Sequence, residues 1–327
     1  MKGKLSKLAT LAGILIFAFI IYKIGPRQIL QNIQSISVKN FLILMVVRVL
    51  YWLLRTYNWK VILDEYEGKS AFYPLFVARM VGHAVSQLSP TAQVGSEATR
   101  MFMVRGKNRR ISVASVIIDK TIESLTVVFF TIIGVATILM RIKLPTNIKV
   151  ILIVGVTLST VFVLLLFLKQ RYGLLTWIAD TLARTKLRFK FFEKNREKFK
   201  EVDQHISEFY QNHRRAFLHV SLLYSLLIML WVVEVYLTVV FLGVTDISFI
   251  DCFLVTTLGN LAFLFPFIPG SVGVYEATYI VLFALIGRSS HVAFTLVLIR
   301  RLIAILLSSF GLLGVFQKKA EKKIVAQ

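Results

Sequence analysis

Long apolar runs constrain the fold of this chain more than any other feature. Runs of roughly 18 or more apolar residues are long enough for a helix to cross a bilayer. Apolar residues make up 57% of the 327 residues and charged residues only 17%, whereas soluble domains carry about 25% charged residues. The predicted full spans lie near 5–24, 41–62, 112–140, 147–168, 216–242 and 291–316. The expected class is therefore an all-α polytopic membrane protein.

Two further apolar stretches, 71–99 and 249–286, are interrupted by helix-breaking residues. Pro90 interrupts the first, and Pro266 and Pro269-Gly270 interrupt the second. Proline removes a backbone donor and kinks or ends a helix. Each stretch is expected to form a broken-helix hairpin that re-enters on the side it left, although two full spans would fit the same pattern.

Basic residues are distributed unevenly over the segments between the runs. With both hairpins re-entrant and the N-terminus cytoplasmic, inner segments hold 26 Lys/Arg and outer segments hold 6. This bias predicts cytoplasmic N- and C-termini in a plasma membrane. It also explains the net charge of +22 without nucleic-acid binding, which we do not expect. Lys2, Lys4 and Lys7 precede the first run, but no small-x-small cleavage site follows it, so 5–24 is expected to be a retained helix.

The chain repeats itself at a constant offset of 179 residues. Trp52 and Tyr57 match Trp231 and Tyr236, and Pro90 and Glu97 match Pro269 and Glu276. Each predicted repeat is a span, a broken hairpin and a span, and the charge count makes the two repeats inverted. Inverted repeats with broken helices typically hold a binding site near the bilayer midplane. A single membrane domain over 1–327 is expected, divided into 5–24 (first helix), 41–140 (repeat 1), 147–168 (connecting span), 169–215 (basic cytoplasmic segment), 216–316 (repeat 2) and 317–327 (basic tail).

The segment 169–215 carries 12 Lys/Arg and 6 Asp/Glu, with Phe189, Phe191, Phe192 and Phe199 among the basic residues. An amphipathic helix on an anionic leaflet would show this pattern. A solvated cytoplasmic loop that follows the positive-inside rule would also show it.

Ionisable residues inside spans are costly and are the main candidates for function. Glu97 and Glu276 each follow a helix break by seven residues, where a carboxylate either serves a site or caps the helix. Arg55 and Glu234 occupy equivalent positions with opposite charge and would make an ion pair across the repeats. Asp119 and Glu123 share a helix face and are expected to pair with arginines of other helices. The candidate substrate-binding residues are Arg55, Arg79, Gln87, Glu97, Arg100, Asp119, Glu123, Glu234, Asn260, Gly270, Gly273, Tyr275, Glu276, Arg300 and Arg301.

Arg79, His83 and Gln87 are spaced by four and would form one polar stripe, or Arg79 would extend to the interface instead. Glycines in the loop from Pro269 to Glu276 allow close approach of a ligand to the backbone.

No catalytic motif, cofactor motif or metal-ligand pair is present, so we expect neither an enzyme nor a cofactor. Cys252 is the only cysteine, which excludes an internal disulfide.

Three elements of the sequence carry a family resemblance: Leu88-Ser89-Pro90 through Glu97 and Arg100, the basic loop Arg105–Arg110, and Pro269-Gly270-Ser271-Val272-Gly273-Val274-Tyr275-Glu276-Ala277. Over about 5–316 the chain resembles the lysylphosphatidylglycerol synthase transmembrane (flippase-like) family. The resemblance implies a relationship to the flippase half of the multiple peptide resistance factor and to stand-alone relatives. Two-part members carry an aminoacyl-transferase domain after the membrane part. This chain ends at Gln327, so we do not expect synthase activity.

The pattern and the resemblance together predict a lipid translocase that moves a phospholipid, glycolipid or polyprenyl-phosphate lipid by alternating access. An ion-coupled transporter of a small soluble solute would use the same architecture, and a membrane-embedded transferase acting on a lipid-linked sugar is a third alternative. The expected partners are a membrane lipid as substrate, an anionic leaflet, and a second copy of the chain or a separate lipid-synthesising enzyme.

Overall fold

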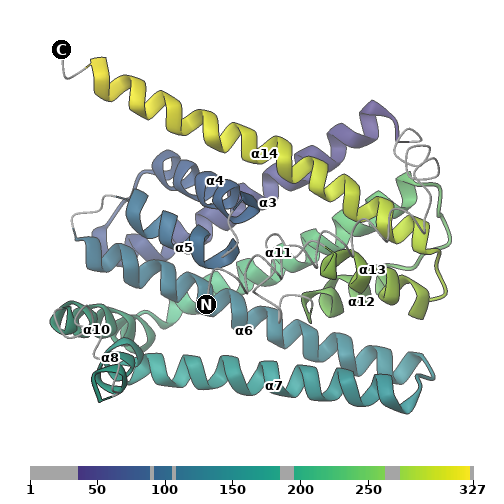
Figure 1. The fold of residues 1–327 in the computed structure, drawn as a ribbon, viewed down its shortest axis with the longest axis horizontal. Coiled ribbons are helices and arrows are strands. Elements are labelled where there is room, and N and C mark those ends of the chain that lie inside the picture. The colour runs from purple at the N-terminus through teal and green to yellow at the C-terminus, as the bar shows by residue number, and fades with distance from the viewer. Residues whose placement is uncertain (1–35, 89–91, 105–107, 185–194, 262–272, 325–327) are drawn as a thin grey trace.

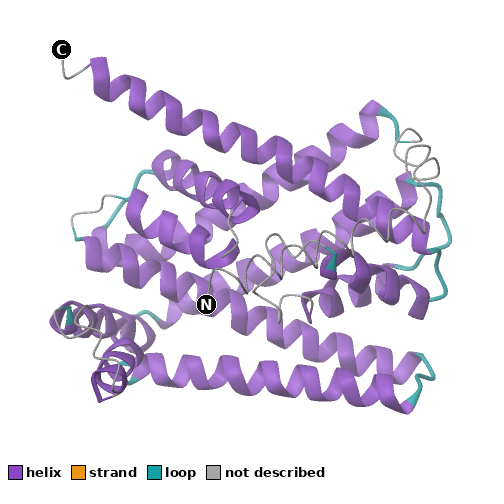
Figure 2. Ribbon diagram, in the orientation of Figure 1, coloured by secondary structure: helices purple, strands orange, loops and turns teal. Residues whose placement is uncertain are grey.

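The computed structural model describes residues 36–88, 92–104, 108–184, 195–261 and 273–324, and the described chain is helical throughout its regular elements (Figures 1 and 2). The predicted first helix, 5–24, lies outside the described residues. The helices, in chain order, are α3 (Val38–Glu67), α4 (Phe72–Leu88), α5 (Ala92–Met103), α6 (Arg109–Arg141), α7 (Thr146–Arg171), α8 (Leu174–Arg184), α10 (Arg196–Asn212), α11 (Arg214–Phe241), α12 (Phe249–Gly259), α13 (Val274–Leu285) and α14 (Ser290–Ile324).

Four of the described helices are long and apolar enough to cross a membrane: α6, α7, α11 and the Ser290–Ser309 part of α14. These match four of the predicted spans. The predicted span at 41–62 is also helical, as part of the 30-residue α3. Its turns carry Arg48, Arg55 and Lys60, which is why composition alone does not place it with the other four. Over the described ranges the chain has the all-helical structure of a membrane protein, with its charges concentrated on particular helices.

The two interrupted stretches each form a pair of short helices. In the first pair, α4 ends at Leu88 and α5 begins at Ala92; in the second, α12 ends at Gly259 and α13 begins at Val274. The breaking residues Pro90, Pro266, Pro269 and Gly270 lie outside the described residues. The members of each pair pack against each other. Figure 1 shows α4 and α5 toward one end of α6, and α12 and α13 toward its other end.

Apolar packing joins these pairs to the long helices. One core cluster lies among α6, α11, α12, α13 and α14 and contains Val235, Leu254, Phe283 and Leu296, all at most 1% exposed. A second cluster lies at the opposite end of α6, where Ile118 and Ile122 meet Ile206 and Phe209 of α10. Helix α14 packs on both α4 and α13, so one long helix connects the first pair to the second.

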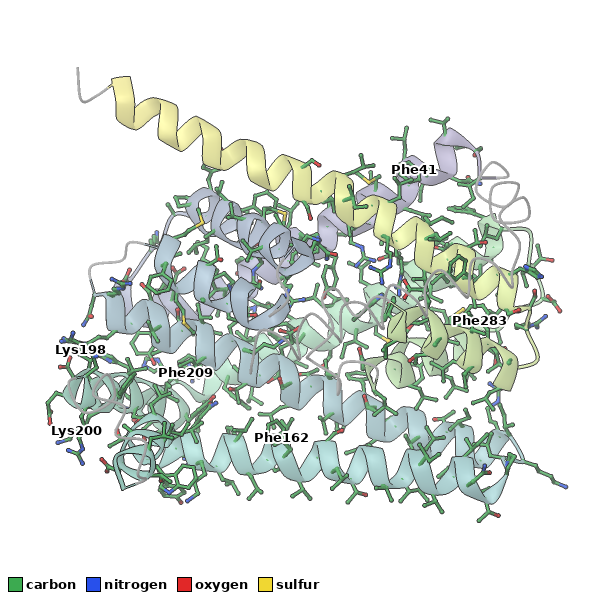
Figure 3. All side chains as sticks on the ribbon, in the orientation of Figure 1. Phe41, Phe162, Lys198, Lys200, Phe209 and Phe283 are labelled. Carbon is green, nitrogen blue, oxygen red and sulfur yellow. The ribbon has the colours of Figure 1, made fainter. Side chains whose placement is uncertain are left out.

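The described part of the basic segment 169–215 contains two packed helices, α8 and α10. Val202, Ile206 and Phe209 of α10 are buried against the bundle, while Lys198 and Lys200 are on its exposed face (Figure 3). Asp203 of α10 accepts hydrogen bonds from the backbone N–H groups of Leu175 and Thr176 at 3.0 and 2.7 Å, which fixes the start of α8. Helix α10 is thus an amphipathic helix whose apolar face covers α6 and α11. Phe189, Phe191 and Phe192 lie outside the described residues.

Helix α14 continues to Ile324, so residues 317–324 of the expected tail are helical. The helix therefore continues past the predicted end of the last span at 316. The apolar run ends there, but Lys318, Lys319, Glu321, Lys322 and Lys323 are compatible with a continuing helix.

Gly134 provides a test of the packing between α6 and α12. A Cβ at Gly134 would lie 2.3 Å from Thr257 Oγ1 and 3.0 Å from Thr257 Cβ. Threonine is stiff at χ1 and cannot easily move away. We expect Gly134→Ala to reduce the free energy of unfolding by about 1–3 kcal/mol, measured by SDS titration in mixed micelles.

Gly155 of α7 is the matched control, because a Cβ there meets no atom within 4 Å. Gly155→Ala should leave stability unchanged or raise it by up to ~1 kcal/mol through lower backbone entropy in the unfolded chain. Equal effects of the two substitutions would contradict the close α6–α12 contact.

Candidate functional site

The first buried charge centre is Asp119 of α6. Its carboxylate is 0% exposed and accepts hydrogen bonds from Arg79 of α4 at 2.9 Å, Arg100 of α5 at 2.6 Å and Tyr224 of α11 at 2.6 Å. Three helices therefore donate to one carboxylate. A carboxylate in an apolar interior is stable only when it is paired and hydrogen-bonded, which Asp119 is.

Trp59 of α3 lies beside the same two arginines. Its ring centroid is 4.2 Å from the guanidinium carbon of Arg100 and 5.5 Å from that of Arg79. Its indole N–H donates to Ser115 Oγ at 3.0 Å. Both cations thus contact an aromatic face as well as a carboxylate, which offsets part of the cost of their burial.

Three more ion pairs extend this centre. Arg55 of α3 donates to Glu123 at 2.6 Å, and Lys120 donates to the same carboxylate at 3.2 Å. Arg100 also pairs with Glu97 at 2.6 Å. We call this set the first network: Arg55, Arg79, Glu97, Arg100, Asp119, Lys120, Glu123 and Tyr224. The prediction that Asp119 and Glu123 pair with arginines of other helices is confirmed.

Glu234 of α11 is the centre of a second network. It is 1% exposed and pairs with Arg48 of α3 and with Arg300 of α14, the latter at 3.2 Å. Arg300 also donates to the hydroxyls of Tyr275 and Tyr279 at 2.9 and 2.8 Å. As at Asp119, one buried carboxylate is shared by two guanidiniums from different helices.

Glu276 completes the second network and also caps α13. One of its carboxylate oxygens accepts from the backbone N–H of Gly273 at 2.7 Å, and the other pairs with Arg301 of α14. Gly273 has φ +84°, a conformation that favours glycine. The second network therefore comprises Arg48, Glu234, Tyr275, Glu276, Tyr279, Arg300 and Arg301.

The matched glutamates make different contacts. Glu276 is the third residue of α13 and caps it, whereas Glu97 is the sixth residue of α5 and pairs with Arg100 on the following turn. Both matched glutamates thus pair with an arginine, but only Glu276 caps its helix.

The predicted pair between Arg55 and Glu234 is wrong. Arg55 pairs with Glu123, and Glu234 pairs with Arg48, which lies two turns before Arg55 on the same helix. Helix α3 packs on both α6 and α11, so its successive arginines reach carboxylates on different helices. The alternative in which Arg79 extends to the interface is also wrong, because Arg79 is 3% exposed and bound to Asp119.

The other predicted residues lie apart from these centres. Gln87 is exposed near the end of α4 and joins neither network. His83 is partly buried against the ring of Trp52, with ring centroids 4.4 Å apart. Asn260 is partly buried, and its amide nitrogen has no hydrogen-bond partner. Gly270 lies outside the described residues.

The candidate list included Tyr275 but missed Arg48, Tyr224 and Tyr279. Tyr279 follows Tyr275 by four residues, and their hydroxyls are hydrogen-bonded. Arg55 follows Tyr51 by four residues and donates a hydrogen bond to its phenol oxygen at 2.9 Å. The signal available in the sequence was a tyrosine one helical turn away from a charged or polar residue. Tyr224 carried no such local signal, since its partner Asp119 is on another helix.

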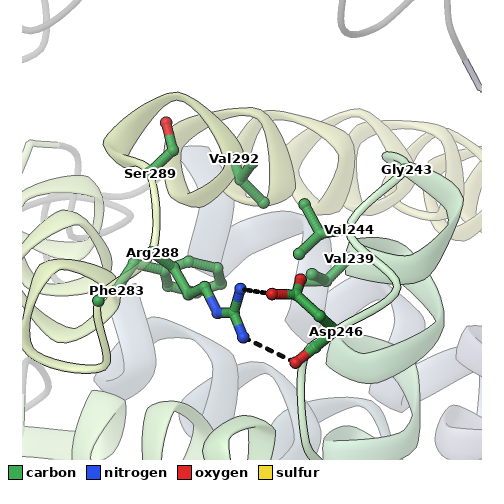
Figure 4. Close-up of a pocket in the computed structure, with 9 residues that line it drawn as sticks. Val239, Gly243, Val244, Asp246, Phe283, Arg288, Ser289 and Val292 are labelled. Atoms are coloured by element: carbon green, nitrogen blue, oxygen red, sulfur yellow. Dashed lines mark hydrogen bonds and ion pairs between the residues drawn. The ribbon is translucent and has the colours of Figure 1, made fainter.

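A small cavity lies near the ends of α11 and α13 and the start of α14 (Figure 4). Its volume is about 300 Å³. A glycine of positive φ follows each helix two residues after its end: Gly243 after α11 and Gly287 after α13. Arg288 pairs with the carboxylate of Asp246 and donates to its backbone oxygen at 2.7 Å. The hydrogen bond from Arg288 to the carboxylate holds the pKa of Asp246 below its usual value. The pair connects the loops after α11 and α13 and lies apart from both networks.

No group of three or more His, Cys, Asp or Glu suited to a metal ion occurs in the part of the chain that the structure describes. The side chains of the two networks supply guanidinium, ammonium, carboxylate and phenol groups. Such groups can bind and release an anion, and arginine suits the oxygens of phosphate because its donors form a planar fork.

Comparison with known proteins agrees with the fold. A model of the lysylphosphatidylglycerol synthase TM region matches residues 6–311. The chain belongs to this family. It is 26% identical over 323 residues to a UPF0104 membrane protein of Methanothermobacter thermautotrophicus, covering 93% of this chain and 92% of the relative. It is 22% identical over 346 residues to a UPF0104 membrane protein of Pyrococcus horikoshii, covering 98% of each. The predicted membership of the lysylphosphatidylglycerol synthase TM family is confirmed.

Asp119 offers a direct test of the first network. Asp119→Asn keeps the side-chain volume but leaves Arg79 and Arg100 without their shared carboxylate. Removing one partner of a buried ion pair typically costs about 3–5 kcal/mol, and we expect a loss of that size in mixed-micelle unfolding. The control is Glu201→Gln in the half-exposed Arg110–Glu201 pair, where a change of about 0–1 kcal/mol is expected. A small effect at Asp119 would show that the network is not the main stabilising contact between these helices.

Proposed function

We propose that this protein is a lipid translocase that moves the anionic headgroup of a phospholipid, glycolipid or polyprenyl-phosphate lipid across the cell membrane. The observation that carries the proposal is the pair of ion networks buried within the helical bundle. Burying charges in a membrane protein is costly, and such charges usually line a substrate path. Each network centres on one carboxylate shared by two arginines.

The balance of charge favours an anionic substrate. Among the described residues, the ion pairs of the two networks contain seven basic and five acidic side chains. The excess of cations in an apolar interior would be neutralised by a bound anion. A phosphate group can bridge two guanidiniums, as Asp119 and Glu234 do here. In this mechanism the carboxylates hold the arginines in place until a headgroup exchanges with them.

The positions of the two helix pairs support alternating access. The predicted inverted repeats, 41–140 and 216–316, correspond to α3–α6 and α11–α14, each in the order long, short, short, long. The first pair lies toward one end of α6 and the second toward the other (Figure 1). In an inverted arrangement each pair would open its network to one side of the membrane. The acyl chains would stay in lipid while the headgroup moves between the networks.

Translocation can be measured in proteoliposomes with fluorescent phosphatidylglycerol and an impermeant quencher. We expect the wild-type protein to accelerate the exchange of phosphatidylglycerol between leaflets. Arg300→Lys should reduce this rate about tenfold or more, because lysine has no planar fork of donors to reach Glu234 and two tyrosines at once. The control is Arg141→Lys, in the exposed Arg141–Asp251 pair, which should keep the wild-type rate.

The proposal fails if proteoliposomes exchange neither phosphatidylglycerol nor a polyprenyl phosphate faster than empty liposomes. A protein that instead released a trapped soluble phosphate ester from the vesicles would be a transporter of a small solute.

A further inference from the structure

Four aromatic side chains form a continuous group between the two networks. Tyr51 and Trp52 of α3 have ring centroids 5.6 Å apart, and Tyr51 lies 6.3 Å from Trp231 of α11. Trp52 also contacts His83 of α4 at 4.4 Å. We call these four residues the aromatic centre. Trp52 and Trp231 are the matched tryptophans of the 179-residue offset, and neither belongs to an ion pair.

The aromatic centre lies where α3 passes from one network to the other. Arg48 pairs with Glu234 in the second network, and Arg55 pairs with Glu123 in the first. The two arginines are seven residues apart, about 10 Å along a helix. Tyr51 lies between them, with its ring centroid 5.6 Å from the guanidinium carbon of Arg48 and 5.9 Å from that of Arg55. A headgroup that passes from one network to the other along α3 therefore meets the aromatic centre.

Buried donors around the aromatic centre have no acceptor. The indole nitrogens of Trp52 and Trp231 are buried without a hydrogen-bond partner. The same holds for Nε of Arg55 and for Nη2 of Arg300, whose guanidinium carbons lie 5.5 and 5.2 Å from the Trp52 and Trp231 rings. An unsatisfied buried donor is costly, and each such group in a native structure calls for an explanation, such as a water or an ion that completes it.

The hydroxyl of Tyr51 does not provide an acceptor for these unpartnered N–H donors. It accepts a hydrogen bond from Nη1 of Arg55 at 2.9 Å, which leaves Nε of Arg55 and both indoles without an acceptor. By contrast, Trp59 donates to Ser115 Oγ at 3.0 Å. Trp52 and Trp231 thus lack the hydrogen-bond acceptor that the buried Trp59 has.

We propose that the aromatic centre is a binding site for the phosphodiester group of a lipid in transit, with Trp52 and Trp231 donating their indole N–H groups to its oxygens beside Arg55 and Arg300. This deepens the proposed function and rests on it. Both matched tryptophans take the same role, one from each repeat.

The type of unsatisfied atom selects the ligand. At the aromatic centre the unpartnered atoms of Trp52, Trp231, Arg55 and Arg300 are all N–H donors, and Nε2 of His83, a donor or an acceptor according to its tautomer, is unpartnered as well. A phosphodiester offers oxygen acceptors and one negative charge but no donor, so it satisfies them without adding an unmet group. A sugar hydroxyl carries no charge, and its oxygen accepts a weaker hydrogen bond from these donors than a charged phosphate oxygen does. The site is therefore selective for the phosphate-bearing part of a lipid over an uncharged glycosyl headgroup.

Binding to the purified full-length protein in detergent tests the site independently of transport. Three probes are titrated by calorimetry: short-chain phosphatidylglycerol, a glucosyl diacylglycerol with the same chains, and inorganic phosphate. Trp52→Phe and Trp231→Phe keep an aromatic ring and remove the N–H donor. Trp177→Phe is the control, because Trp177 is 51% exposed on α8. We expect each of the first two substitutions to weaken phosphatidylglycerol binding about tenfold, the usual effect of losing a hydrogen bond to a charged group, and the control to leave it unchanged.

Indole ¹⁵N NMR of the wild-type protein gives a readout that needs no substitution in the site. Phosphatidylglycerol should shift the N–H signals of Trp52 and Trp231 downfield. The signal of Trp59, which already has an acceptor, and that of Trp177 should stay in place.

The site is overturned if the glucosyl lipid binds as tightly as phosphatidylglycerol, or if neither indole signal moves and both tryptophan substitutions leave binding intact. Inorganic phosphate binding as tightly as the lipid would overturn the assignment to a lipid. Tight, tryptophan-dependent lipid binding without exchange between leaflets would support the site and refute the proposed function, so the two failures are distinguishable.

Discussion

The sharing of Asp119 between Arg79, Arg100 and Tyr224 is the contact on which the rest of the structure depends. It joins α4, α5 and α11 to α6 in an apolar interior, where each charge would be costly alone. Glu234 does the same for α3, α11 and α14 through Arg48 and Arg300. The short helices α4 and α5 are therefore held by charge as well as by apolar packing. Contacts of this kind can exchange partners, which apolar packing alone does not allow.

Helix α3 connects the two networks. It contributes Arg48 to one and Arg55 to the other, and it is the long helix whose composition departs most from that of a simple membrane span. Its arginines are tolerated because each has a carboxylate partner on a neighbouring helix. The proposed path of a headgroup follows this helix, from one shared carboxylate to the next. Structure and proposed function thus use the same side chains.

The sequence predicted the helices and their breaks well, because apolar run length and proline position act locally. It also predicted that Asp119 and Glu123 pair with arginines, since their i, i+4 spacing places both on one face. It did not predict which arginine reaches Glu234, because Arg48 and Arg55 share a helix face and only the packing of α3 on α11 and α6 separates them. Tyr224 was missed for the same reason. Helix α10 is buried through an apolar stripe of Val202, Ile206 and Phe209. This stripe lies in a segment in which charged residues dominate the composition.

The central claim is that the two helix pairs open to opposite sides of the membrane, and Thr99 of α5 and Thr278 of α13 test it most directly. They are equivalent at the 179-residue offset, are partly buried, and each donates to the carbonyl four residues earlier. Thr99→Cys and Thr278→Cys would be made in a Cys252→Ala background and labelled with an impermeant maleimide from one side of the membrane at a time. We predict that the cysteine at 99 reacts only from the side of α8 and α10, and the cysteine at 278 only from the opposite side. Reaction of both from the same side would contradict the account.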